Sequence, residues 1–447
     1  MALMISVSGI RGLFGTDLNP ENLARFAASY GTWTGGGTVV LGRDSRVTGE
    51  LCEQVITAAL QSVGCDVIKL GIVTTPTVAM GVLRHKAAGG IVISASHNPA
   101  QWNALKLLND RSEFLDADQG ATVMKIAQES GPKYVSYDKI GSVSYDEDIS
   151  QYHIDEILKL PYIDRETISK GDFRVAVDAV NGAGSIIIPE LLRQLGVKTI
   201  DTIHCTPNGI FPHNPEPLPE HLTEICDLVK TSGANIGFVT DPDGDRLALI
   251  DENGRFIGEE YTIAVSLDFH LGKKSGPIAV NLSSSRISEV IAQKHGVTCH
   301  RSAVGEINVV KKMQEVNAVS GGEGNGGVIN PDLHPGRDAL VGIAMTLQFL
   351  AEQKITLGAY RDSLPDFHIV KSKVELGSVN ADEVLAKVTQ IYANEKINTI
   401  DGVKIDFEDG WVHLRKSNTE PIIRVYSEAM SEKRAREIAA PVMEQLK

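Results

Sequence analysis

The chain has 447 residues, of which 42% are hydrophobic and 22% charged. This composition is typical of a water-soluble globular protein with several domains, at roughly 100–200 residues each. The formal net charge of −14 argues against nucleic-acid binding, which requires an extended basic surface. No apolar run approaches the roughly 20 residues that span a bilayer, so no membrane association is expected.

The cysteines are far apart in the sequence and include no Cys-x-x-Cys pair. A disulfide framework and a structural zinc site are therefore not expected. Residues 1–11 contain no basic region followed by an apolar segment, so no signal peptide is expected and we predict a cytoplasmic protein. The five cysteines are Cys52, Cys65, Cys205, Cys226 and Cys299.

The first segment predicts alternating strands and helices. It opens with glycines on both sides of Arg11, which would let backbone approach a ligand, although an ordinary turn with a solvated arginine is the alternative. The alternation favours a mostly parallel sheet with helices on both faces, in which ligands bind beyond the carboxyl ends of the strands. The strands are expected at 38–41, 66–70 and 90–93, and the helices at 49–64 and 76–85.

The same order recurs twice further along the chain. The order is strand, polar loop, helix, glycine and strand, and it begins at residue 173 and again at residue 277. With the first segment, this makes three occurrences and predicts three related α/β domains. From about residue 366 the pattern changes to that of a small α+β domain with an antiparallel sheet. The predicted domains are 1–160, 161–257, 258–365 and 366–447.

A short polar stretch follows the predicted strand at 90–93. In Ser94-Ala95-Ser96-His97-Asn98-Pro99, the proline excludes helical geometry from the residue before it and forces a turn. We expect Ser96 at the exposed end of the strand on a tight loop, as a candidate carrier of a phosphoryl group. A strand-ending turn of small residues is the alternative.

Three carboxylates at alternate positions follow an apolar strand at 236–239. Asp241, Asp243 and Asp245 can converge on one hard cation, and Mg²⁺ suits them because no His or Cys takes part. An EF-hand loop is excluded, since Arg246 occupies the position that needs glycine and a strand is predicted at 247–250. A solvated acidic turn is the alternative.

Two more loops carry groups suited to a polar ligand. Glu323 and Asn325 lie in a segment with five glycines in seven residues, 321–327, and a carboxylate and an amide suit sugar hydroxyls. Arg415 and Arg424 bracket a segment of small donors, and arginine forks match phosphate oxygens. The alternatives are a flexible hairpin tip and a solvated charged face. The donors are Ser417, Asn418 and Thr419.

Together, these four motifs resemble the α-D-phosphohexomutase family, in the family's order and over nearly the whole chain. The resemblance implies three α/β domains and a TBP-like C-terminal domain around a central cleft. It implies that Ser96 is the phosphoserine, that Mg²⁺ is held by the three aspartates and a Ser96 phosphate oxygen, and that Glu323 and Asn325 bind the sugar.

The resemblance also implies further roles. The groups expected to hold the non-reacting phosphate are Arg415, Ser417, Asn418, Thr419 and Arg424. Arg11, Lys106 and Arg246 match family positions near the transferring phosphoryl, and Lys106 is the candidate for polarising Ser96 or moving its proton, with a surface lysine as the alternative. His97 adjoins Ser96 in sequence, which favours a positioning role.

Four positions depart from the usual family pattern: Ser94 for threonine, Ala104 for glycine, and Glu306 and Gly327 where some members have histidine. The Gly-Gly-Glu-x-Asn-Gly-Gly form of the glycine-rich loop is similar to archaeal-type phosphoglucosamine mutases.

The expected activity is therefore the interconversion of hexose 6-phosphate and hexose 1-phosphate through a hexose 1,6-bisphosphate. Glucosamine phosphate is the favoured substrate, and mannose or glucose phosphate follows closely. A magnesium-dependent sugar phosphatase and a non-catalytic phosphosugar sensor are the alternatives from other classes. The expected partner is a small sugar phosphate, and a monomer or homodimer is expected.

Overall fold

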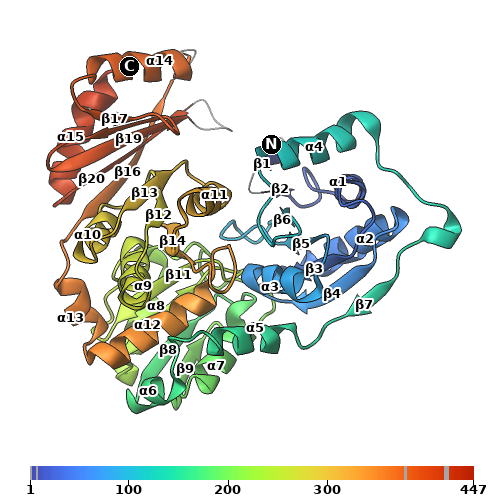
Figure 1. The fold of residues 1–447 in the computed structure, drawn as a ribbon, viewed down its shortest axis with the longest axis horizontal. Helices are drawn as coiled ribbons and strands as arrows, with labels where there is room; N and C mark the ends of the chain where they lie inside the picture. The colour runs from blue at the N-terminus through green and yellow to red at the C-terminus, as the bar shows by residue number, and fades with distance from the viewer. Residues whose placement is uncertain (1–2, 7–8, 377–379, 417–421, 447) are drawn as a thin grey trace.

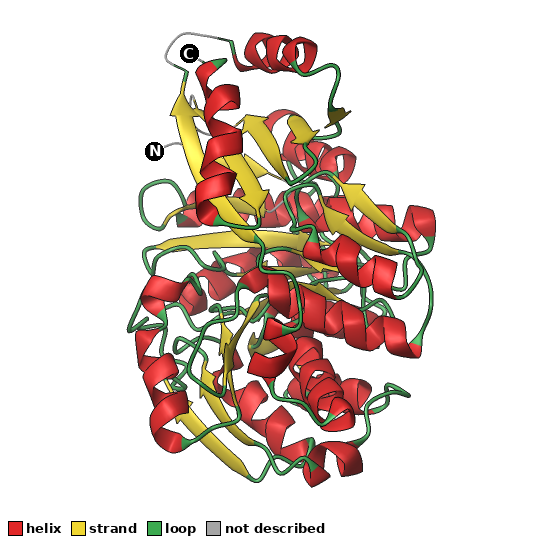
Figure 2. Cartoon of the chain, turned by 90° about the vertical axis from the view of Figure 1, so that its left-hand side faces the viewer, coloured by secondary structure: helices red, strands yellow, loops and turns green. Residues whose placement is uncertain are grey.

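The computed structural model describes residues 3–6, 9–376, 380–416 and 422–446. Four sheets follow one another along the chain, each with its own helices (Figure 1). Three belong to α/β units with mixed, mostly parallel sheets, and the fourth is antiparallel, as the sequence predicts. In the side view, helices flank the strands of the α/β units (Figure 2). None of the helices in the described ranges is both long and apolar enough to cross a bilayer.

The first unit has a seven-stranded sheet in the order β1-β2-β6-β5-β3-β4-β7. Its centre is parallel, since β3 pairs with β4 and β5, but β6 returns antiparallel to β5. The elements are β1 (Met4–Ser6), β2 (Gly9–Leu13), α1 (Pro20–Trp33), β3 (Val39–Arg43), α2 (Gly49–Ser62), β4 (Val67–Ile72), α3 (Thr75–His85), β5 (Gly89–Ile93), β6 (Trp102–Leu108), α4 (Ala117–Lys125), the π-helix η1 (Ile126–Ser130), the 3-10 helix η2 (Tyr137–Lys139), β7 (Val143–Tyr145) and α5 (Ile149–Leu158).

The second unit has a four-stranded sheet in the order β11-β10-β8-β9, in which only β11 is antiparallel to its neighbour. The antiparallel return places the loop between β10 and β11 at the carboxyl end of the parallel strands. The elements are α6 (Arg165–Lys170), β8 (Arg174–Asp178), α7 (Gly184–Gln194), β9 (Thr199–Ile203), the 3-10 helix η3 (Pro219–His221), α8 (Thr223–Ser232), β10 (Ile236–Thr240) and β11 (Leu247–Asp251).

The third unit repeats this arrangement, with strand order β13-β12-β14-β15 and an antiparallel last pair. The elements are α9 (Glu259–Lys273), β12 (Ile278–Asn281), α10 (Ile287–Lys294), β13 (Cys299–Ser302), α11 (Glu306–Val316), β14 (Ser320–Glu323), β15 (Gly327–Ile329), α12 (Ala339–Gln353) and α13 (Leu357–Asp362).

The fourth unit is a five-stranded antiparallel sheet in the order β16-β20-β19-β18-β17, with two helices. In Figure 1 it lies at the upper left, opposite the first unit. The elements are β16 (His368–Glu375), α14 (Ala381–Ile391), β17 (Lys396–Asn398), β18 (Val403–Asp406), β19 (Gly410–Lys416), β20 (Ile422–Ala429) and α15 (Glu432–Glu444).

The largest hydrophobic core joins the second and third units and includes Ile154 and Ile157 of α5, and one cluster of the first unit includes Ile307 of α11. One continuous cluster of buried side chains runs from Val177 and Phe238 to Leu340 and Phe349. The first unit has a cluster on each face of its sheet, and the fourth has its own. The second and third units therefore form one packed body, while the fourth has a core of its own. The boundaries predicted at residues 160, 257 and 365 stay predictions.

Candidate active site

The loop after β5 holds Ser96 beneath the surface. The residue is only 3% exposed, which corrects the expectation of an exposed strand end, because the loop after β10 packs against it. Ser96 has a left-handed φ of 50°, an uncommon conformation for a residue with a side chain. Its N–H donates to Ser94 Oγ at 2.9 Å, and Asn98 N–H closes the predicted turn onto the carbonyl of Ala95.

A buried arginine that the sequence analysis missed holds this loop in place. Arg46 is 1% exposed, and its guanidinium donates to the carbonyls of Ser96 at 2.6 Å and Asn98 at 2.7 Å. It also donates to Asp44, which accepts from Ser94 Oγ at 2.6 Å. Because five guanidinium N–H groups are fixed in one plane, Arg46 fixes the course of the loop.

The loop between β10 and β11 brings its three carboxylates together, as predicted. Asp241, Asp243 and Asp245 are fully buried, and one oxygen of each lies within 4.8 Å of the others. Ser96 Oγ donates to Asp241 Oδ2 at 2.6 Å. Gly244 sits at the sharp bend of the loop, with a φ of 65° and no room for a side chain beside Thr74.

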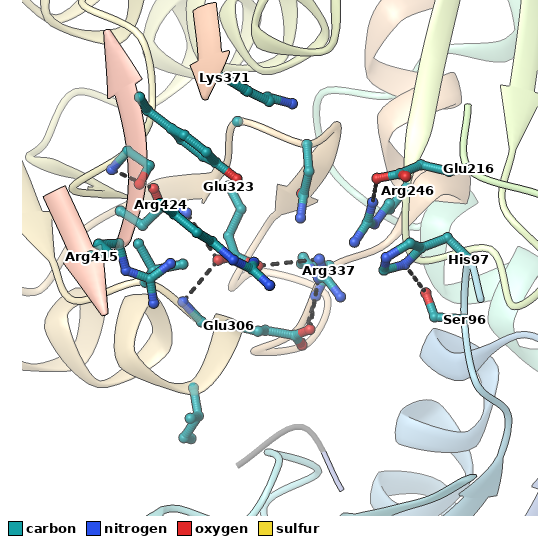
Figure 3. Close-up of a pocket in the computed structure, with 18 of the residues that line it drawn as sticks. Ser96, His97, Glu216, Arg246, Glu306, Glu323, Arg337, Lys371, Arg415 and Arg424 are labelled. Carbon is teal, nitrogen blue, oxygen red and sulfur yellow. Dashed lines mark hydrogen bonds and ion pairs between the residues drawn. The ribbon is translucent and has the colours of Figure 1, made fainter. Parts of the chain in front are cut away.

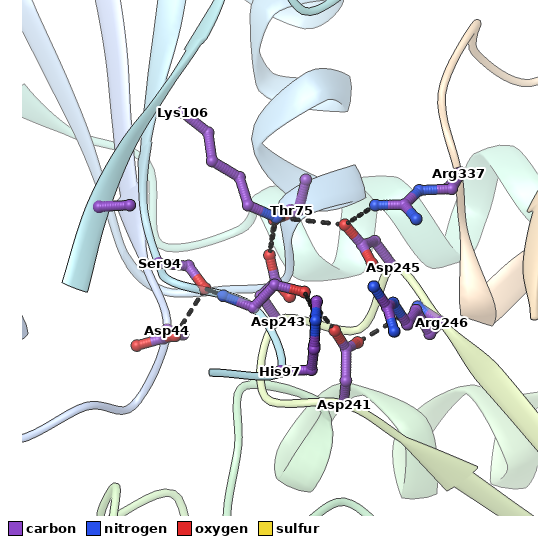
Figure 4. A network of polar contacts seen from close by, with 12 residues as sticks. Asp44, Thr75, Ser94, His97, Lys106, Asp241, Asp243, Asp245, Arg246 and Arg337 are labelled. Atoms are coloured by element: carbon purple, nitrogen blue, oxygen red, sulfur yellow. Dashed lines mark hydrogen bonds and ion pairs between the residues drawn. The ribbon is translucent and has the colours of Figure 1, made fainter. Parts of the chain in front are cut away.

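Cations and hydroxyls from other units surround these carboxylates (Figure 4). Lys106 Nζ lies 2.5 Å from Asp243 Oδ2 and 3.1 Å from Asp245 Oδ2, and Thr75 donates to Asp243. Burial opposes the charge of Lys106, but the two carboxylates outweigh it and raise its pKa. Lys106 is therefore not the surface lysine of the alternative interpretation.

The donor set fits Mg²⁺, for which oxygen ligands are preferred. One oxygen each of Asp243 and Asp245 is buried and has no hydrogen-bond partner among the described residues. Burial and the two neighbouring carboxylates raise the pKa of Asp241 well above its usual value. A bound divalent cation would offset the repulsion between these carboxylates.

A pocket of about 400 Å³ adjoins this cluster and is lined by all four units. Ser96, His97 and Arg246 lie on one side, Arg415 and Arg424 lie on the opposite side, and Lys371 lies at the top of the view (Figure 3). The pocket is thus bordered by cations at both ends, which suits a ligand with two anionic groups.

The remaining residues predicted near the phosphoserine also line the pocket. Arg11 donates to Asn98 Oδ1 at 2.5 Å, and Arg246 lies 3.4 Å from Glu216. His97 Nδ1 is 3.3 Å from Ser96 Oγ. Burial and the nearby arginines lower the pKa of His97 well below its usual value, so the ring is neutral at pH 7.

The glycine-rich segment forms the tight hairpin between β14 and β15. Glu323 and Asn325 both line the pocket, as expected for residues two positions apart. A side chain at 324 would lie 1.8 Å from Glu260, and one at 326 would lie 2.2 Å from the Leu247 carbonyl. The glycines are therefore required for close packing, which argues against a flexible tip.

Arg337 connects this hairpin to the carboxylate cluster and was not found from the sequence. Its guanidinium lies 2.7 Å from Asp245, 2.8 Å from Glu306 and 3.1 Å from Glu323. Burial opposes its charge, but the carboxylates raise its pKa well above the usual value. A Cβ on Gly327 would lie 2.2 Å from Arg337 Cδ. Two of the four departures from the family pattern therefore concern Arg337: Glu306 pairs with it, and Gly327 leaves room for it.

The two arginines of the fourth unit are direct cross-strand neighbours. Arg415 on β19 pairs with Arg424 on β20, and both line the pocket together with Lys371 of β16. Like charges directly opposite destabilise a sheet, and Asp401 Oδ2, 2.9 Å from Arg415 Nε, supplies a counter-charge to Arg415. Lys371 was missed because one lysine in a strand gives no signal. The predicted donors Ser417, Asn418 and Thr419 lie outside the described residues.

Comparison with known proteins places the chain in a family. Four phosphoglucomutase/phosphomannomutase models match in succession: α/β/α domain I at residues 3–133, domain II at 151–254, domain III at 258–367 and the C-terminal domain at 370–445. The chain belongs to this family, the phosphohexomutases, and is an isomerase. Most members use Mg²⁺.

Individual relatives match over almost the full length. A Thermococcus kodakarensis protein named phosphoglucomutase/phosphomannomutase is 37% identical over 98% of this chain and 97% of its own. A Methanopyrus kandleri protein named "Probable phosphoglucosamine mutase" is 33% identical over 98% and 96%. The crystal structure of a phosphoglucomutase/phosphomannomutase family protein from Burkholderia thailandensis has a TM-score of 0.83 at 25% identity, covering 99% of this chain and 98% of that one.

Proposed function

We propose that this phosphohexomutase interconverts glucosamine 6-phosphate and glucosamine 1-phosphate through a phosphoserine at Ser96 and a bisphosphate intermediate. The observation that carries the proposal is the 2.6 Å contact between Ser96 Oγ and Asp241 Oδ2. It joins residues 145 positions apart, at one end of a pocket whose other end contains Arg415 and Arg424.

Asp241, Asp243 and Asp245 would hold Mg²⁺, with an oxygen of the Ser96 phosphate as a further ligand. When bound, the ion offsets the negative charge of the phosphoryl group and the charge that develops during its transfer. Arg246 and Arg11, which line the same end of the pocket, contribute further positive charge.

In the first transfer, the sugar hydroxyl oxygen attacks the phosphorus of phosphoserine 96. The new O–P bond forms while the P–Oγ bond breaks, and the electron pair of the P–Oγ bond stays on Ser96 Oγ. The proton lost by the sugar hydroxyl ends on Oγ, and Lys106 is our candidate for stabilising that oxygen or relaying the proton. His97, which is neutral, positions the Ser96 side chain.

The second transfer reverses these bonds at the other end of the sugar. Arg415 and Arg424, with Ser417, Asn418 and Thr419, hold the phosphate that is not reacting. Glu323 already accepts from Asn281 and from Gly305 N–H, and a carboxylate keeps acceptor capacity for a sugar hydroxyl. The hydrophobic core of the fourth unit is its own, which allows this unit to move while the bisphosphate turns.

Two features support glucosamine phosphate as the substrate: the Gly-Gly-Glu-x-Asn-Gly-Gly hairpin and the name of the Methanopyrus relative. The name of the Thermococcus relative favours glucose or mannose phosphate as the alternative. Rates on the three hexose 6-phosphates, measured side by side, decide between them. We expect the enzyme to act on the small molecule as a monomer or homodimer.

Phosphorus NMR of one reaction mixture tests the reaction class. The mixture contains glucosamine 6-phosphate, Mg²⁺ and a trace of hexose 1,6-bisphosphate as activator. We expect the 1-phosphate to appear without free phosphate. Free phosphate would instead identify a magnesium-dependent phosphatase, and no change with any of the three sugars would identify a non-catalytic sensor.

A further inference from the structure

A second group of metal-binding side chains lies in the second unit, away from the residues that line the active-site pocket. Asp178 ends β8, His204 follows β9, and His213 lies in the loop beyond it. One oxygen of Asp178 is 3.0 Å from His204 Nδ1 and 3.1 Å from His213 Nε2. One ligand atom from each residue lies within 4.8 Å of the others.

The outer nitrogens of both rings also have acceptors. His213 Nδ1 is 2.9 Å from the carbonyl of Asn214, and His204 Nε2 is 3.4 Å from Glu224 Oε2. Histidines that ligate metals usually donate their second N–H to a carbonyl or carboxylate, which fixes the tautomer and the ring orientation. Both rings are thus oriented with the inner nitrogen directed at Asp178.

Without a cation, the inner and outer contacts of His213 compete for one hydrogen. A neutral imidazole with its hydrogen on the outer nitrogen presents a lone pair to the carboxylate, so contact with Asp178 would be repulsive. A neutral His204 avoids this by donating its Nδ1–H to Asp178, since its outer contact is an exposed carboxylate 3.4 Å away. A neutral His213 that donates its Nε2–H to Asp178 would instead turn a lone pair to the Asn214 carbonyl, so without a cation only the protonated His213 satisfies both of its contacts. A single divalent cation in place of the two inner protons satisfies all the contacts with neutral rings.

Two of the three separations between ligand atoms are close to those around a tetrahedral ion. Ligands about 2.0–2.1 Å from Zn²⁺ are separated by roughly 3.3 Å in a tetrahedron, and the two nitrogen–oxygen distances here are 3.0 and 3.1 Å. Asp178 is 1% exposed, while the side chains of His204 and His213 are 16% and 13% exposed. Asp178 therefore lies on the buried side of the site, and the two rings are partly exposed to solvent.

We propose that Asp178, His204 and His213 form a binding site for Zn²⁺, separate from the carboxylate cluster of the active site. Imidazole nitrogens favour zinc over Mg²⁺, which prefers six oxygen ligands. The sequence argument against structural zinc considered only the cysteines, and this site uses none of them.

The ion would fix a loop that borders the active site. The segment from His204 to Leu218 carries Phe211, whose ring lies 5.0 Å from the guanidinium carbon of Arg46, and Glu216, which pairs with Arg246. Zinc at the start of this segment ties it to β8 and limits its movement against the loop that contains Ser96.

Zinc content of the full-length protein tests the proposal. The protein is stripped with a chelator and dialysed against Zn²⁺ with excess Mg²⁺, which competes at the carboxylate cluster. It is then desalted and analysed for bound metal. We expect one zinc per chain for the wild type and an affinity at least tenfold lower for His204→Asn and for His213→Asn. A wild type without bound zinc, or variants that bind it as tightly as the wild type, would overturn the proposal.

His85→Asn is the matched control, because His85 pairs with one carboxylate, that of Asp146, at 2.7 Å. It should bind zinc like the wild type. If the test variants do not fold, the visible spectrum of the Co²⁺-loaded wild type decides. Strong absorption bands of tetrahedral, nitrogen-ligated Co²⁺ support the site, whereas the weak spectrum of six oxygen ligands contradicts it.

Discussion

The guanidinium of Arg337 lies 2.7 Å from the carboxylate of Asp245, and this contact links the third unit to the carboxylate cluster of the second. The same side chain pairs with Glu306 and Glu323, so one cation balances acidic groups from three segments of the chain. The hairpin between β14 and β15 and the carboxylate cluster of the second unit are therefore connected through one side chain.

Replacing Arg337 by methionine should destabilise the protein and slow turnover. The change leaves three buried carboxylates without this partner, and removal of one partner from a buried ion pair typically costs about 3–5 kcal/mol. Urea unfolding measures the loss. Arg193→Met, which removes an exposed pair with Glu190, should cost less than about 1 kcal/mol. Equal stability of the two variants would contradict the role assigned to Arg337.

Gly327→Ala should disturb the same side chain without altering any charge. Its Cβ would lie 2.2 Å from Arg337 Cδ, and overpacking of this kind costs about 1–3 kcal/mol. Gly120→Ala in α4 is the control, because no atom lies within 4 Å of the added Cβ and alanine favours helix. We expect a lower melting temperature for the first variant and an equal or higher one for the second. The reverse order would show that Arg337 is not confined by Gly327.

Arg46→Lys should impair catalysis although the charge is retained. An ammonium group cannot reproduce the planar fork that reaches the carbonyls of Ser96 and Asn98 together with Asp44. We expect kcat to fall at least tenfold, because the geometry of the loop that contains Ser96 is altered. KM should change less, because the proposed contacts of Arg415 and Arg424 with the non-reacting phosphate are unaffected. Arg84→Lys, at an exposed pair with Asp146, should have wild-type kinetics. An unchanged kcat in Arg46→Lys would contradict the role of Arg46.

Arg424→Ala should mainly weaken substrate binding. Loss of a charge-assisted hydrogen bond to phosphate costs about 1.5–3 kcal/mol, so KM should rise about tenfold to a hundredfold while kcat changes little. Steady-state kinetics measure both constants. Arg436→Ala, on the exposed face of α15, is the control. A lost kcat with an unchanged KM would show that Arg424 acts in the chemical step and not in anchoring.

The functional side chains in loops that directly follow strands could be predicted from the sequence, because an apolar strand followed by a polar loop is a local pattern. Ser96 and the three aspartates lie at carboxyl ends of strands, and the structure brings them together as expected. Their burial could not be predicted, since it results from packing of the second unit against the first. The helix α1 and the strand β6 were also missed in the first unit.

The missed residues share a physical reason. Arg46, Arg337 and Lys371 act on partners from distant parts of the chain, and an isolated basic residue has no local signature. The pairing of Glu306 with Arg337 likewise depends on the positions of two helices, α11 and α12. The cluster of Asp178, His204 and His213 was not predicted because its members come from the end of β8 and from two positions beyond β9.

The most direct measurement follows the phosphoryl group itself. The enzyme is phosphorylated with labelled hexose 1,6-bisphosphate and isolated. One portion is digested to identify the labelled peptide, and a second, intact portion is mixed with unlabelled glucosamine 6-phosphate. The account predicts label on Ser96, its transfer into the sugar bisphosphate, and neither labelling nor turnover in Ser96→Ala, which should still bind glucosamine 6-phosphate. Full mutase activity in Ser96→Ala, or label on another residue, would contradict the account.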